Sequence, residues 1–99
     1  MMAKAKKTTK RRAVLVRTYS AGVHFGYLVS RKGQEVVLAG SRRIWYWKGA
    51  NTLSEIALHG VGPGSKVAER VDIILIQAIE VISMAADGVK SLEAAKWPT

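Results

Sequence analysis

Between residues 13 and 47 the chain is a series of short apolar runs, each ended by a tight-turn signal. The runs cover residues 13–19, 23–30, 34–39 and 42–47. They are rich in β-branched and aromatic residues, which favour strands. The turns between them hold only a few residues, and connections this short join antiparallel strands, because a parallel connection needs a dozen or more. We therefore predict a four-stranded antiparallel meander, with Gly40-Ser41 as its last turn.

Two helical segments follow the meander. Thr52 and Glu55 have the spacing of a capping box, and Gly60 can end the helix that they begin. A terminal helix is predicted over residues 85–96, where apolar residues recur at helical spacing. The predicted fold class is α+β: a small antiparallel, barrel-like sheet with one inserted helix and a C-terminal helix.

The segment 71–82 fits two structures. Its apolar residues recur at helical spacing, but it is also dense in β-branched residues, and periodicity does not decide between helix and strand. We favour a strand, because a meander needs more sheet to cover its apolar face.

The charge is concentrated at the N-terminus. The chain has 16 Lys and Arg against 7 Asp and Glu, a formal net charge of +9. Residues 1–12 hold six of these cations and no acid. We predict that this segment is a disordered basic tail and that residues 13–99 form a single domain. The tail fits an arm that binds nucleic acid through counterion release, and equally a solubilising extension.

Several classes of function are excluded or disfavoured by what the chain lacks. It has no Cys, so it has no disulfide or thiolate metal site. No apolar run approaches the roughly 20 residues that span a bilayer. The two His have no spaced partner, and the glycine-rich loop at 60–66 does not fit the phosphate-loop pattern. We predict a binding protein without metal, cofactor or enzymatic activity.

The densest chemistry lies in the stretch RRIWYWK at 42–48, where arginines alternate with aromatic residues. Arginine binds phosphate through paired donors, and aromatic faces stack on bases. The candidate ligand-binding residues on this and the neighbouring strands are Arg17, Tyr19, His24, Phe25, Arg42, Arg43, Trp45 and Trp47. In a strand, Arg43, Trp45 and Trp47 share one face and Arg42 points to the other. Packing in the core is the competing interpretation, above all for Trp45 and Trp47.

The sequence resembles a family of small tailed-phage proteins. The resemblance rests on TYSAGVHFG at 18–26, GQEVVL at 33–38, RRIWYWKGA at 42–50, AIEVI at 78–82 and AAKW at 94–97. The pattern is also similar to the phage sponges that counter Thoeris immunity. That resemblance implies tight binding of a cyclic ADP-ribose-type signal without cleavage, in the cytoplasm of an infected bacterial host. It assigns no ligand contact to a numbered residue.

A 99-residue domain has little room for a deep pocket, so enclosure of such a ligand implies a homo-oligomer. The alternative is a basic phage accessory protein that binds nucleic acid through residues 1–12. A third interpretation is an accessory protein that binds another protein through its aromatic face.

Overall fold

The computed structural model describes residues 11–95, which form one six-stranded sheet and two helices. The strands are β1 (Ala13–Thr18), β2 (Val23–Lys32), β3 (Glu35–Tyr46), β4 (Lys66–Val67), β5 (Val71–Leu75) and β6 (Ala78–Ser83). The helices are α2 (Leu53–His59) and α3 (Ala86–Ala94). All strand pairs are antiparallel. This α+β architecture confirms the predicted fold class.

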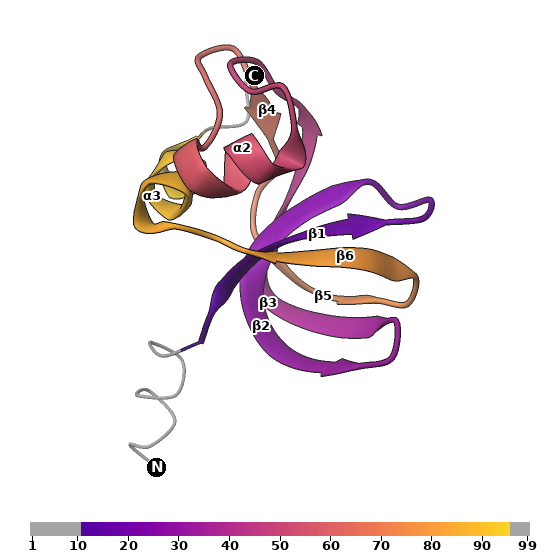
Figure 1. The fold of residues 1–99 in the computed structure, drawn as a ribbon. Helices are drawn as coiled ribbons and strands as arrows, with labels where there is room; N and C mark the ends of the chain where they lie inside the picture. The colour runs from indigo at the N-terminus through magenta and orange to yellow at the C-terminus, as the bar shows by residue number, and fades with distance from the viewer. Residues whose placement is uncertain (1–10, 96–99) are drawn as a thin grey trace.

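The sheet curls until its two edges meet. Its order is β4-β3-β2-β1-β6, and β5 also pairs with β3, beside β4. β5 and β6 therefore lie at opposite edges, yet only Ile76 and Gln77 connect them. The Gln77 carbonyl accepts a hydrogen bond from the Tyr19 amide (3.0 Å), and the Ala78 amide donates one to the Gln34 carbonyl (3.0 Å). The strands thus enclose a small barrel, with the long β2 and β3 bent around it (Figure 1).

Two apolar clusters fill the molecule on opposite faces of β1. Val14 and Val16 point into the barrel, where they pack with side chains from β3, β5 and β6. Leu15 points the other way, into a second cluster that includes Phe25 and the helix residue Leu92. Successive side chains alternate across a strand, so a strand buried on both faces has apolar residues in succession.

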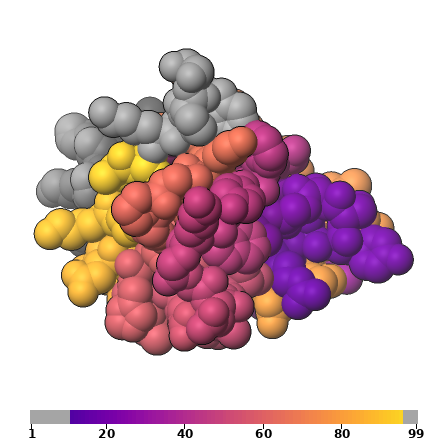
Figure 2. Space-filling model, turned by 90° about the horizontal axis from the view of Figure 1, so that it is seen from above, coloured from indigo at the N-terminus to yellow at the C-terminus, as the bar shows by residue number. Residues whose placement is uncertain are grey.

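The helices cover the end of the barrel opposite the β1–β2 turn (Figures 1 and 2). Helix α2 begins as predicted: Thr52 Oγ1 accepts a hydrogen bond from the Glu55 amide (3.2 Å). Gly60, with φ of 84°, follows its last residue. Helix α3 lies close to α2 at Gly88, where an added Cβ would come within 2.3 Å of the Ala57 carbonyl oxygen. Glycine is therefore required for this approach.

Two predictions about where the strands begin and end were wrong. The segments 34–39 and 42–47 are one continuous strand, β3, rather than two strands joined by a turn. Gly40 has φ of 58°, and the register with β5 shifts between Leu38 and Ser41. Glycine supplies the same left-handed conformation to a turn and to a bulge. Gly40 predicts a turn from the sequence, but it lies in a bulge of β3.

The segment 71–82 is strand and not helix, as favoured from the sequence, but it forms two strands, β5 and β6, rather than one. The corner at Ile76-Gln77 contains none of the usual turn residues, so the sequence gives no sign of it. Strand β4 was not predicted. The C-terminal helix ends at Ala94, within the range expected, whereas the basic tail, apart from residues 11 and 12, and residues 96–99 lie outside the described residues.

A candidate ligand-binding hollow

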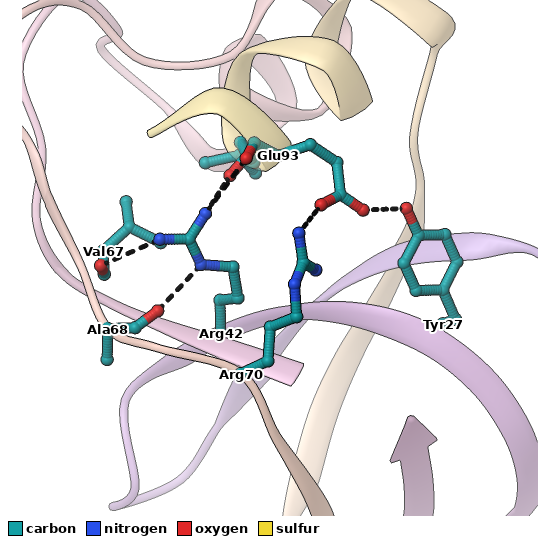
Figure 3. A network of polar contacts seen from close by, with 7 residues as sticks. Tyr27, Arg42, Val67, Ala68, Arg70 and Glu93 are labelled. Carbon is teal, nitrogen blue, oxygen red and sulfur yellow. Dashed lines mark hydrogen bonds and ion pairs between the residues drawn. The ribbon is translucent and has the colours of Figure 1, made fainter. Parts of the chain in front are cut away.

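The two adjacent arginines of the RRIWYW block occupy opposite environments. Arg42 is 6% exposed, and its guanidinium donates hydrogen bonds to four backbone carbonyls (Figure 3). These carbonyls belong to Ala68 (2.8 Å), Val67 (3.2 Å), Leu92 (2.8 Å) and Glu93 (3.3 Å). Burial and the charge of Arg70 lower the pKa of Arg42, but an arginine remains protonated in proteins. Arg42 is therefore a structural residue and not the ligand contact that was predicted.

A second polar contact fixes α3 to the barrel beside Arg42. The Glu93 carboxylate accepts hydrogen bonds from the Tyr27 hydroxyl and from Arg70, with which it also forms an ion pair (Figure 3). Burial alone would raise the pKa of Glu93, but the hydrogen bonds from Arg70 and Tyr27 and the charges of Arg70 and Arg42 outweigh it, so that pKa is lowered. Burial and the bond to Glu93 raise the pKa of Tyr27 to about 12.

Arg43 lies in a hollow of about 310 Å³ at the β1–β2 end of the barrel. It is exposed, and it makes no ion pair with any described residue. The rest of the lining is neutral and comes from two segments: Thr18, Ser20 and Ala21 of the β1–β2 turn, and residues 73–77 of β5 and the corner after it. The hollow thus combines one unneutralised guanidinium with an apolar wall and a few hydroxyl and amide groups.

The β1–β2 turn that lines the hollow is held in one conformation. Thr18 Oγ1 accepts a hydrogen bond from the Ala21 amide (2.8 Å) and donates one to the Gly22 carbonyl (2.8 Å). His24, which is 1% exposed, donates from Nε2 to the Ala21 carbonyl (2.9 Å) in the tautomer that this contact requires. The predicted ligand contact His24 is therefore a buried residue that positions the turn.

The lowered pKa of His24 keeps its imidazole uncharged at neutral pH. Burial lowers the pKa of the imidazole, the Ala21 hydrogen bond raises it, and the nearby charge of Arg43 lowers it again. The net pKa lies below the ordinary value of 6.5. The ring therefore adds no second positive charge to the hollow at neutral pH.

Two predicted aromatic residues lie near Arg43. Tyr19 is 77% exposed and sits between two residues of the lining. Trp45 is on the same face of β3 as Arg43, as predicted, and is 53% exposed. The Lys66 ammonium lies 4.9 Å from the centroid of its ring, a cation–π contact. The ammonium of Lys66 therefore places a positive charge beside the Trp45 ring, two residues along β3 from Arg43.

The other predicted contacts do not reach the hollow. Phe25 is fully buried in the core, with its ring 5.6 Å from that of Tyr27. Trp47 is half-buried and packs against the cluster that contains Leu15, Phe25 and Leu92, as expected for a residue that packs in the core. Arg17 lies 3.6 Å from Glu80 as an ion pair and is not part of the lining. Of the eight predicted residues, Arg43 lines the hollow, the exposed Tyr19 lies between two lining residues in the chain, and Trp45 is two residues from Arg43 on β3.

Sequence reasoning missed the apolar wall of the hollow. That wall is formed by Ile73, Ile74 and Ile76, which belong to the segment 71–82 that the sequence predicts as a strand. Residues 76 and 77 carry no turn signal, so the local sequence does not predict the corner that places this wall. Within residues 11–95, no group of His, Asp or Glu is arranged to hold a metal ion, and no helix is both long and apolar enough to cross a membrane.

The sequence model of a family described as Domain of unknown function (DUF6948) matches residues 11–92, which include the lining of the hollow, helix α2 and most of helix α3. No curated protein and no solved structure matches the chain.

We predict that Arg42→Met destabilises the protein by about 2–4 kcal/mol, because buried carbonyls lose charged donors that methionine does not replace. The matched control is Arg43→Met, one residue along, which should change the free energy of unfolding by less than about 0.5 kcal/mol. Chemical denaturation of both variants measures the difference. Equal losses would show that the bonds of Arg42 add no stability.

The lowered pKa of Glu93 predicts acid sensitivity. Between the folded pKa and the ordinary value of 4.5, the unfolded chain binds more protons than the folded chain. The contribution of Glu93 is thus present above pH 4.5 and disappears as the pH falls through the folded pKa. Denaturation of the wild type and Glu93→Gln across pH 3–7 should show a smaller acid loss in the variant. Parallel curves would contradict the prediction.

Proposed function

The chain belongs to the DUF6948 family, and from the hollow described above we propose that it binds and sequesters a nucleotide signal of the cyclic ADP-ribose type without converting it. The setting that fits such a role is the cytoplasm of an infected bacterial host, where removal of the signal would block an antiphage defence. The observation that carries the proposal is the exposed guanidinium of Arg43 in an otherwise neutral, largely apolar hollow.

The composition of the hollow complements such a ligand. A pyrophosphate accepts the paired donors of a guanidinium, and Arg43 has no carboxylate partner among residues 11–95 that would compete. Adenine is a flat group that gains from contact with apolar and aromatic surfaces. Ile73 and Ile74 supply such a surface inside the hollow, and Tyr19 stands beside it.

The same residues favour retention of the ligand over reaction. The lining contains hydroxyl and amide groups and one arginine, but no carboxylate. The nearby imidazole of His24 is buried, and its Nε2 is engaged with the Ala21 carbonyl. General acid–base catalysis needs a titratable group within reach of the substrate. The hollow therefore supports a sponge rather than an enzyme.

One copy of the chain does not enclose a dinucleotide-sized ligand. At about 310 Å³, the hollow is at the lower end of the roughly 300–1,000 Å³ typical of ligand pockets. Two apolar side chains of its own wall are left largely in solvent: Ile74 is 59% exposed and Ile76 is 71% exposed. Strand β5 pairs only with β3 among the described residues, so its outer edge is also uncovered. We infer that a second copy covers this corner and completes the site, in a contact that is symmetric about a two-fold axis.

The first test is the binding of cyclic ADP-ribose by isothermal titration calorimetry. We expect a Kd below about 1 μM for the wild type, and recovery of intact ligand after heat denaturation. Arg43→Ala should weaken binding by about 10–100-fold through loss of a charged hydrogen bond. Lys90→Ala, which removes an exposed cation on α3, is the matched control and should bind as the wild type does. Hydrolysed ligand, or an unchanged affinity for Arg43→Ala, would contradict the proposal.

The second test concerns the partner copy. Ile76→Asn should shift the protein toward the monomer in light scattering and weaken ligand binding in parallel, because a polar group would be buried in the contact. Val29→Asn alters a valine of β2 that is 44% exposed and lies outside the hollow lining, and it should leave both properties unchanged. A monomeric wild type that binds the ligand with full affinity would show that no second copy is needed.

A further inference from the structure

We propose that Arg12 and Arg31 bind phosphates of a nucleic-acid backbone at a gap in the barrel wall. This function is separate from the nucleotide hollow. The gap, called the seam below, lies between β2 and β6 and encloses about 340 Å³. No residue of its lining also lines the hollow that contains Arg43.

The seam exists because β6 pairs with β1 but not with β2 or β3 in the described part of the chain. The hairpin of β2 and β3 bends toward the corner after β5 and is held there by the bond from Ala78 to Gln34. Between this hairpin and β6, no backbone ladder closes the wall. The floor of the opening is formed by Val14, Leu28 and Val81.

The cations of the seam are available to an anion. Arg31 is exposed and makes no ion pair with any residue in 11–95. Arg12 is exposed too, and its contact with Ser83 Oγ is long, at 3.5 Å. The carboxylate in the lining, Glu80, lies 3.6 Å from Arg17, so part of its charge is already compensated. The local balance at the seam therefore favours a phosphate.

Further cations precede Arg12 in the sequence. Lys4, Lys6, Lys7, Lys10 and Arg11 all precede Arg12, with no acid among residues 1–12. Ten residues of chain span at most about 35 Å when extended, and phosphates follow at about 3.4 Å along one strand. A backbone phosphate at Arg12 and Arg31 would thus be the first of several within reach of the segment.

The lining also indicates which part of a nucleic acid the seam would bind. It contains no aromatic residue and no Asn or Gln, so it offers no stacking surface and no amide group for reading adenine. We expect its two arginines to contact phosphates, which carry no sequence information. Residues 1–12 have no aromatic side chain and no large apolar one except Met1 and Met2, which favours nucleic acid over a membrane surface.

The test uses a labelled 20-base-pair DNA duplex and fluorescence anisotropy with the full chain at several salt concentrations. We expect binding at 50 mM salt that weakens steeply by 200 mM, as counterion release requires. Arg31→Gln should weaken binding about threefold to tenfold and reduce the slope of log K against log salt by about 0.9, the value for one phosphate contact. Replacing Lys4, Lys6, Lys7 and Lys10 by Gln should reduce that slope by about 3–4.

Lys90→Gln removes the same charge from α3, outside the seam, and is the control for a general effect of net charge. If Arg31→Gln and Lys90→Gln give the same slope of log K against log salt, the seam is not the site. This holds even if the variant in which Lys4, Lys6, Lys7 and Lys10 are replaced loses binding. Absence of duplex binding at 50 mM salt would overturn the proposal as a whole. So would binding to vesicles with 30% phosphatidylserine that is tighter than binding to DNA. Cyclic ADP-ribose affinity should not change in Arg31→Gln, so the two functions fail separately.

Discussion

The buried guanidinium of Arg42 links the sheet to the C-terminal helix through hydrogen bonds to four backbone carbonyls. The last carbonyls of a helix have no partner within the helix, and α3 has no basic residue in its last turn. Arg42 reaches from β3 to donate to the carbonyls of Leu92 and Glu93 and thereby supplies a positive charge where the helix dipole is negative. The same group binds Val67 and Ala68 at the end of β4. One side chain thus joins the barrel, the loop after β4 and the C-terminal helix.

The position of Arg42 also determines the candidate site. Because side chains alternate along a strand, burying Arg42 against α3 turns Arg43 to the opposite face, where it enters the hollow. A slip of one residue in the pairing of His24 with Arg43 would exchange the two arginines. Fold and proposed function are therefore coupled through the register of β3, and the matched arginine variants separate the two roles.

The two proposed binding regions share a physical origin. Both lie where the curled sheet leaves a part of its wall without a strand ladder, one at the corner of β5 and β6 and one between β2 and β6. Each places at such an opening an arginine that forms no ion pair with a carboxylate in the described part of the chain. A barrel this small fills its interior with side chains, so its hollows lie at the ends and seams.

The elements of this fold that can be predicted from the sequence are those whose signals are local. The capping box at Thr52 and Glu55, the antiparallel order of β1 to β3 and the alternation of Arg42 and Arg43 all follow from spacing within a few residues. Long-range packing, by contrast, determines which arginine is buried, that Gly40 lies in a bulge, and that Ile76 and Gln77 form the corner between β5 and β6. The carbonyls that hold Arg42 lie 25 to 51 residues away. An environment built from such distant segments has no signature in the residues near Arg42, because it exists only once the sheet has curled and α3 has docked.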